Sequence, residues 1–220
     1  MVIAQCKQLI KVYPGAQNLR ALDEVSLSIK QGEFVSIMGP SGCGKSTLLN
    51  ILGLLDEPSG GAYVLNGVPT EKLSDARRTE LRRNQIGFIF QSFNLMPRLS
   101  VLENIALPMR YTKMTRTDIL PRARELAVRV GLEKKLNSTP LQLSGGQCQR
   151  VACARSLANN PSIILADEPT GNLDSKASVD ILTLLKELND GGMTIIMVTH
   201  DPKIAAGTHR TIHMKDGKII

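Results

Sequence analysis

Tryptophan is absent from this chain of 220 residues, and aromatic residues make up only 3% of it. A surface on which the bases of single-stranded nucleic acid stack is hard to build from so few rings. Apolar runs are short as well, and none approaches the 18 or more residues of a membrane-spanning helix. We therefore expect no direct membrane insertion, so that any work at a membrane needs another chain to span it.

Cysteine and histidine are also scarce, with four and three copies, and their spacing fits no zinc motif. No two cysteines form a C-x-x-C pair, so reduced thiols are the plain interpretation of Cys6, Cys43, Cys148 and Cys153. Residues 1–11 lack the pattern of a secretory signal. Both observations lead us to expect a cytoplasmic protein.

The formal net charge is +7, which suits DNA, RNA, anionic lipid or a polyanionic ligand without choosing among them. Part of the excess is a cluster on a predicted helix, formed by Arg77, Arg78, Arg82 and Arg83. A solvated helix face is the alternative to a binding surface for such a cluster. The hydrophobic content of 42% is that of an ordinary globular chain with its own core.

The arrangement of predicted elements indicates an α/β fold. Short apolar runs separated by Gly and Pro predict strands at residues 2–9, 25–29, 34–38, 63–66, 86–90, 163–166 and 194–199. Helices are predicted at 48–53 and 178–188, and a final hairpin turns at Asp216-Gly217. From about residue 74 to 160 helical patterns dominate, such as the apolar stripe of Ala123, Leu126, Ala127 and Val130. We therefore expect a helical lobe inserted between core strands.

Four of the predicted strands end in residues suited to phosphate, metal or proton chemistry. Residues 34–38 lead into a glycine-rich loop, and the other three strands end at Gln91, at Asp167 with Glu168, and at His200. Ligands of open parallel sheets sit beyond the carboxyl ends of the strands. One shared site would explain all four endings.

The glycine-rich loop fits the phosphate-binding pattern G-x-x-x-x-G-K-[ST], and a predicted strand precedes it and a predicted helix follows it. Its residues are Gly39, Pro40, Ser41, Gly42, Cys43, Gly44, Lys45, Ser46 and Thr47. In such a loop backbone N–H groups close around phosphates, Lys45 reaches the β and γ phosphates, and Ser46 binds Mg²⁺. A purely structural turn is the alternative. Cys43 stands at a variable position and is expected to be a packing thiol.

The two acids after residues 163–166 suit a site for Mg²⁺ and water. Asp167 would hold or orient the metal shell, and Glu168 would polarise the attacking water as general base. A helix N-terminal cap is the alternative for this pair. Gln91 can bind Mg²⁺ or position water, and His200 can stabilise charge on the γ-phosphate, although either residue in isolation would be an ordinary surface residue.

A second helix start suited to anions follows Leu143, far along the chain from the first. Ser144 and Gln147 form an S-x-x-Q capping box, and Gly145 and Gly146 between them permit close approach of the backbone. A well-capped structural helix is the alternative explanation.

These residues carry a resemblance to the ATP-binding cassette (ABC) family. Leu143 to Gln147 match its signature sequence, and the phosphate loop, Gln91, Asp167-Glu168, Asn172-Leu173-Asp174 and His200 follow in the family's order over essentially the whole chain. The resemblance implies a P-loop NTPase cassette with a mixed-sheet RecA-like core, an N-terminal antiparallel β subdomain and an inserted helical subdomain. It implies one nucleotide-binding domain over residues 1–220, with core and β lobe at about 1–90 and 161–220 and the helical lobe at about 91–160.

The resemblance also implies how the parts work. ATP would be sandwiched in a head-to-tail homodimer between the phosphate loop of one subunit and the signature helix of the other, and hydrolysed to ADP and phosphate. Tyr13 would stack on adenine, with a core tyrosine as the alternative, and Asp174 would communicate between the two sites. Gln91 marks the loop that touches an integral membrane permease in this family. The chain would then lie peripherally on the inner face of the cell membrane.

Two stretches, residues 93–104 and 166–174, resemble the branch of the family that performs lipoprotein release and macrolide export. Amino-acid importer subunits are also similar to this chain, but more often differ over residues 170–172. Cys148 and Cys153 depart from the usual residues of the signature helix and are expected to be small hydrophobes there. One alternative is a non-transport ABC protein acting on DNA or ribosomes. The other is a phosphate-loop kinase that uses Lys45 and Ser46. We expect no nucleic acid partner.

Overall fold

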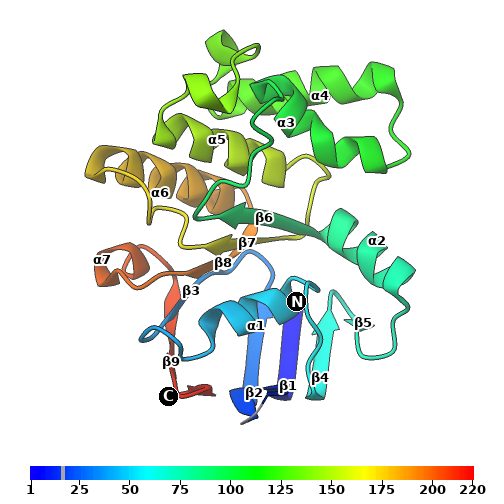
Figure 1. Cartoon of the computed structure of the whole chain (residues 1–220), viewed down its shortest axis with the longest axis vertical. Helices are drawn as coiled ribbons and strands as arrows, with labels where there is room; N and C mark the ends of the chain where they lie inside the picture. Colours follow the sequence, from blue (N-terminus) through cyan, green and yellow to red (C-terminus); the bar gives the residue numbers. More distant parts are fainter. Residues whose placement is uncertain (16–17) are drawn as a thin grey trace. The chain divides into compact units, whose positions relative to one another are not determined.

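The computed structural model describes residues 1–15 and 18–220, which divide into two compact units (Figure 1). The first unit comprises Met1–Arg82 and Asn189–Ile220, and the second comprises Arg83–Leu188. The predicted division into a core with β lobe at about 1–90 and 161–220 and a helical lobe at about 91–160 stays a prediction.

The first unit opens with an antiparallel sheet in the order β2-β1-β4-β5. Its strands are β1 (Val2–Tyr13), β2 (Leu19–Lys30), β4 (Gly60–Leu65) and β5 (Val68–Pro69). β1 and β2 are longer than the predicted 2–9 and 25–29, because pairing continues to Tyr13 and Leu19 through several register shifts. The shifts break the alternation of apolar and polar residues on which the prediction rested.

A second set of strands in this unit surrounds β3 (Phe34–Met38). β8 (Thr194–Val198) and β9 (Arg210–Lys215) lie parallel to it on either side, and β10 (Lys218–Ile219) pairs antiparallel with β9. Asp216 and Gly217 have φ of 47° and 78°, as a two-residue hairpin turn requires, so the predicted hairpin is confirmed. Parallel and antiparallel pairing together make this a mixed sheet.

Two short helices complete the first unit, α1 (Lys45–Leu52) and α7 (Pro202–Ala205), and α2 (Asp75–Gln85) carries the arginine cluster. All four arginines bond to acceptors of the protein. Arg77 and Arg78 pair with Glu80 and Glu57, and Arg82 and Arg83 donate to the backbone oxygens of Leu54 and Tyr111. All four guanidinium groups are therefore held by acceptors of the protein, while the pair of Arg77 and Glu80 stays exposed to solvent.

The second unit contains two parallel strands, β6 (Ile86–Phe90) and β7 (Ile163–Asp167). Between them in the chain come α3 (Val101–Ala106), α4 (Arg116–Arg129) and α5 (Gly145–Ser156), with 3₁₀ turns η1 (Leu107–Tyr111), η2 (Glu133–Lys135) and η3 (Pro140–Gln142). The three helices pack together, as Figure 1 shows, and α6 (Ser175–Asp190) follows β7. The predicted stripe of Ala123, Leu126, Ala127 and Val130 is buried.

A capping box fixes the start of α3. Ser100 and Glu103 form a reciprocal capping box at α3, and hydrogen bonds from Ser100 hold the pKa of the Glu103 carboxyl below its usual value.

All four cysteines are free and buried. Burial raises the pKa of Cys6 and Cys153 to about 12, so these two are packing thiols and not nucleophiles. Among the described residues, no helix combines the length and apolar character that crossing a membrane requires.

Gly87 of β6 lies close to Ser156 at the end of α5. A Cβ at this position would lie 2.4 Å from the backbone oxygen of Ser156, so helix or strand has to move. We expect Gly87→Ala to lower the free energy of unfolding by about 1–3 kcal/mol, the usual cost of overpacking. Urea denaturation measures it, with Gly60→Ala as matched control because a Cβ there meets nothing closer than 3.7 Å. Equal stability of the two variants would contradict this packing.

Candidate functional site

The phosphate loop of the first unit runs from the end of β3 to the start of α1 and has room for glycine alone at two points. A Cβ at Gly39 would lie 2.1 Å from the backbone oxygen of Met214, and one at Gly44 would lie 2.4 Å from that of Ala21. Gly44, with φ of 99°, also caps α1 in a left-handed conformation. The loop is therefore shaped by close backbone packing, and α1 starts at Lys45 instead of the predicted 48.

Lys45 is the first residue of α1, at the end of this loop, with 8% of its surface exposed. Its Nζ donates to the backbone oxygens of Gly39 and Pro40, at 2.8 Å each. A buried ammonium at a helix N-terminus gives the loop a concentrated positive potential. Ser46 is exposed directly after it, so a cation and a hydroxyl stand together at the helix start.

The C-terminal hairpin supports the loop from outside. Gly217 donates its N–H to the backbone oxygen of Cys43 at 3.1 Å, and its own oxygen accepts from the N–H of Asp23 at 2.9 Å. The sequence predicted the turn at Asp216-Gly217 but gave no sign of this contact. The turn fixes the middle of the loop to the antiparallel sheet.

Tyr13 lies at the end of β1, half-buried, so it is not the core tyrosine of the alternative interpretation. Its hydroxyl donates to Asp56 Oδ2 at 2.8 Å and lies within bonding reach of Thr47. Burial, followed by the bond to Asp56, raises the pKa of Tyr13. Lys11 places its Nζ 2.6 Å from Asp56 Oδ1 and 4.8 Å from the Tyr13 ring centre. The ring is thus held beside the last residue of the phosphate loop.

His200 follows β8, which pairs in parallel with β3. The N–H of Thr199 donates to the backbone oxygen of Ile37 at 3.2 Å, so both strands end at the same edge. His200 is exposed there. The structure therefore brings His200 and the phosphate loop to one edge of the first unit, as expected for neighbouring parallel strands.

In the second unit the other two strand endings also meet. Phe90 is the register partner of Asp167, so Gln91 and Glu168 emerge side by side. Glu168 has a φ of 43°, an uncommon conformation for a residue with a side chain, and its backbone oxygen accepts from the N–H of Gly171 at 3.0 Å. The next helix, α6, starts only at Ser175. The alternative in which Asp167 and Glu168 cap a helix is therefore wrong.

The start of α5 has the capping box that the sequence predicted. Ser144 Oγ accepts from the N–H of Gln147 at 3.3 Å, and Gln147 Oε1 accepts from the N–H of Ser144 at 3.0 Å. Ser144 and Gly145 are exposed. This leaves N–H groups at the helix start open to an anion from outside the unit.

Asp174 lies close to the start of α5. Both line a hollow of about 170 Å³ between the beginnings of α5 and α6. Asp174 Oδ1 accepts from the N–H of Ala177 at 2.8 Å and so caps α6. The other lining residues are Ser144, Gly146, Gln147, Arg150, Lys176, Ala177 and Asp180. The second unit thus presents two capped helix starts on one exposed surface.

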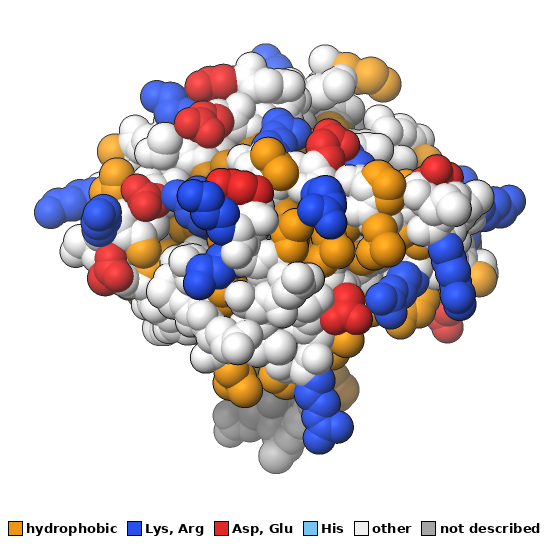
Figure 2. Space-filling view, turned by 90° about the horizontal axis from the view of Figure 1, so that it is seen from above, with side chains coloured by type: hydrophobic (Ala, Val, Ile, Leu, Met, Phe, Trp, Pro, Cys, Tyr) orange, Lys and Arg blue, Asp and Glu red, His pale blue; other side chains and the backbone are white. Residues whose placement is uncertain are grey.

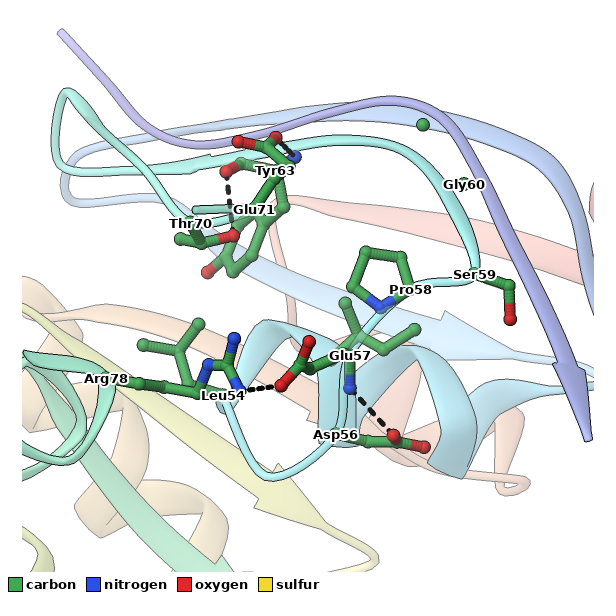
Figure 3. Close-up of a pocket in the computed structure, with 12 residues that line it drawn as sticks. Leu54, Asp56, Glu57, Pro58, Ser59, Gly60, Tyr63, Thr70, Glu71 and Arg78 are labelled. Atoms are coloured by element: carbon green, nitrogen blue, oxygen red, sulfur yellow. Dashed lines mark hydrogen bonds and ion pairs between the residues drawn. The ribbon is translucent and has the colours of Figure 1, made fainter. Parts of the chain in front are cut away.

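A larger hollow of about 220 Å³ lies in the first unit beside Tyr63 and contains none of the predicted site residues (Figure 3). Its carboxylates are already bonded within the protein. Glu71 accepts from the N–H of Tyr63, Glu57 pairs with Arg78, and Asp56 accepts from Lys11 and Tyr13. Its polar lining therefore supports the fold next to Tyr13 instead of offering a second site.

The chain is similar to known proteins over most of its length. The model of the family described as ABC transporter matches residues 22–171. The uncharacterised ABC transporter ATP-binding protein YvrO of Bacillus subtilis is 48% identical over 206 residues, covering 94% of this chain and 90% of that protein. The macrolide export ATP-binding/permease protein MacB of Campylobacter jejuni is 51% identical over 199 residues, covering 90% of this chain but 31% of MacB. The chain thus spans about a third of MacB.

A solved structure extends the similarity to three dimensions. The dimeric ATP-binding cassette MJ0796 of Methanocaldococcus jannaschii, in a post-hydrolysis state bound to ADP and Pi, matches with a TM-score of 0.90 and 48% identity. The match covers 99% of this chain and 96% of that one. The predicted fold class, a mixed-sheet core with an N-terminal antiparallel β subdomain and an inserted helical subdomain, is confirmed.

Proposed function

This chain belongs to the ABC transporter family and is an ATPase, and from that premise we propose that it drives a separate membrane-embedded permease by closing and opening as a dimer. The observation that carries the proposal is the pair of helix starts suited to anions, one behind the phosphate loop and one at Ser144. A single nucleotide occupies one phosphate loop. An exposed second start suits the terminal phosphate of a nucleotide held by another copy.

We assign the chemistry as follows. The loop with Lys45 and Thr47 binds the phosphates of ATP, and Tyr13 stacks on adenine. Glu168 accepts a proton from the attacking water, and His200 stabilises charge on the γ-phosphate. The second copy contributes its signature residues, which are Ser144, Gly145, Gly146 and Gln147, and its Asp174 links the two sites. The dimeric MJ0796 structure supports this arrangement.

Mg²⁺ fits the oxygen donors that the assignment provides. Ser46 offers a hydroxyl, Gln91 an amide oxygen and Asp167 a carboxylate, the hard ligands that this cation prefers. In the structure Gln91 bonds Asn172 through Nε2, so the amide atom not used in this bond is Oε1. When bound, the cation would neutralise charge on the phosphates.

We place the chain in the lipoprotein-release and macrolide-export branch, working on the inner face of the cell membrane. Similarity to MacB, which unites ATP-binding and permease parts in one protein, supports this placement. Gln91 would couple binding of the cation to contact with the permease.

Two other functions fit the structure less well. A nucleic-acid-binding ABC protein needs a basic field, yet Figure 2 shows Lys and Arg side chains scattered among acidic and apolar ones on the face in view. The arginines of α2 are bonded within the protein. If the chain were a phosphate-loop kinase, the exposed start of α5 at Ser144 would have no role.

Copurification separates these functions. We expect tagged chain from detergent-solubilised cells to retain an integral membrane protein, and we expect that protein to stimulate ATP hydrolysis when the two are reconstituted together. Recovery of nucleic acid instead, released steeply as salt is raised, would favour the DNA or ribosome function. Phosphorylation of a small molecule by the purified chain would favour the kinase.

A further inference from the structure

Gln91 and Asn172, both in the second unit, are joined by two hydrogen bonds. Gln91 directly follows β6, and Asn172 lies in the segment between β7 and α6. Gln91 Nε2 donates to Asn172 Oδ1 at 3.3 Å, and Asn172 Nδ2 donates to the backbone oxygen of Gln91 at 3.1 Å. The side chain of Asn172 therefore bridges the main chain and the side chain of one glutamine.

This bridge determines which atom of the Gln91 side-chain amide, Nε2 or Oε1, faces Asn172. A backbone oxygen only accepts hydrogen bonds, so Asn172 has to turn Nδ2 toward it and Oδ1 toward the Gln91 side chain. Oδ1 in turn only accepts, so Gln91 has to present Nε2. The Gln91 atom left for other partners is Oε1, which is the atom a hard cation binds.

Gly171 makes the space for this arrangement. A Cβ at Gly171 would lie 2.6 Å from Gln91 Nε2 and 3.1 Å from its Cδ. Both are atoms near the tip of a flexible side chain, so an alanine would move the Gln91 amide and leave the backbone in place. Gly171 is thus required by the amide position and not by the turn itself.

The backbone around Gln91 is held from α5. Gln149, which is fully buried, donates Nε2 to the backbone oxygens of Pro169 at 2.6 Å and Phe90 at 3.4 Å. Arg155 donates to the backbone oxygens of Phe93 and Asn94. With both flanks fixed, the orientation of the Gln91 side chain is the remaining variable, and Gly171 and Asn172 set it.

We propose that Asn172 and Gly171 are positioning residues that select the Gln91 orientation in which Oε1 is offered to Mg²⁺. The proposal deepens the proposed function and rests on its assignment of Gln91 to the cation. It does not depend on which permease or substrate the chain serves.

The first test needs neither nucleotide nor cation. Side-chain amide signals of ¹⁵N-labelled protein are recorded by NMR, and that of Gln91 is identified by its loss in Gln91→Glu. In Asn172→Ala and in Gly171→Ala we expect this signal to move toward the position of an exposed glutamine. Asn137→Ala, which removes an exposed asparagine of the same unit, should leave it in place. An unmoved Gln91 signal in both variants overturns the proposal.

The second test is the Mg²⁺ dependence of ATP hydrolysis. We expect Asn172→Ala and Asn172→Asp to raise the Mg²⁺ concentration for half-maximal rate roughly three- to tenfold, the worth of a neutral hydrogen bond. This increase should exceed the loss of rate at saturating Mg²⁺. Asp keeps the shape but cannot donate to the Gln91 backbone oxygen.

A purely structural role gives a different result. It would lower the thermal stability of the Asn172 variants and their rate at all Mg²⁺ concentrations alike, and that outcome overturns the proposal. So does a moved Gln91 signal without a change in Mg²⁺ requirement. Failure of the proposed function would instead appear as absence of a membrane partner in copurification, with the NMR result unaffected.

Discussion

Glu168→Gln is expected to slow ATP hydrolysis by roughly 10²- to 10⁴-fold, the usual contribution of a general base. Glutamine keeps the size of the side chain, so the uncommon backbone conformation at φ 43° is not additionally burdened. What is lost is the ability to take a proton from water. Steady-state phosphate release measures the rate, and a fluorescent ATP analogue measures binding, which should stay intact.

The same variant should accumulate as an ATP-bound dimer, visible by size-exclusion chromatography with light scattering. Glu187→Gln, at an exposed position of α6, is the matched control and should behave as the unmodified protein. Undiminished hydrolysis in Glu168→Gln would remove this residue from the role of base.

Gly145→Asp is expected to abolish turnover while each chain still binds ATP. A Cβ at Gly145 meets nothing closer than 3.4 Å, and an acid in the first turn of a helix is favourable, so α5 should remain folded. The new carboxylate would face the terminal phosphate held by the other copy. Like charges at an interface cost several kcal/mol, which corresponds to a loss of about 100-fold or more. Gly145→Ala adds no charge, so the loss of rate that it causes measures the effect of side-chain bulk alone.

Mixing two inactive variants tests whether the site is shared between copies. Lys45→Ala removes the cation of the phosphate loop but keeps a normal start of α5, and Gly145→Asp does the reverse. A dimer of the two contains one site with both parts intact, so the mixture should hydrolyse ATP faster than the sum of its components. If every ratio gives only that sum, a complete site lies within one chain.

The strand endings were predictable from sequence because each is a local pattern. An apolar run followed by Gly39, Gln91, Glu168 or His200 can be recognised without knowing the fold, and parallel pairing then explains why Gln91 and Glu168 emerge together. The turn at Asp216-Gly217 was equally local, since both residues tolerate a positive φ. The start of helix α5 at Ser144 was predicted from its capping box.

Contacts between distant positions were not predictable. Asn172 and Gln91 are 81 positions apart, and nothing near either residue indicates the other. Gln149 is a polar residue on a helix, which normally faces water, yet it is fully buried because two backbone oxygens need its amide. The arginines of α2 appeared as a charge cluster because the acceptors of three of them, Glu57, Leu54 and Tyr111, lie elsewhere in the chain. Pairing partners are set by tertiary packing, which a single sequence does not display.

The bonds of Lys45 to Gly39 and Pro40 have a consequence for how ATP is admitted. The two backbone oxygens hold the ammonium group against the start of the loop and so tie the loop into a closed ring. With the loop already closed by these bonds, binding of a phosphate to it costs little further ordering of the chain. Recognition at this end of the nucleotide should accordingly be fast and accompanied by only small movements of the main chain.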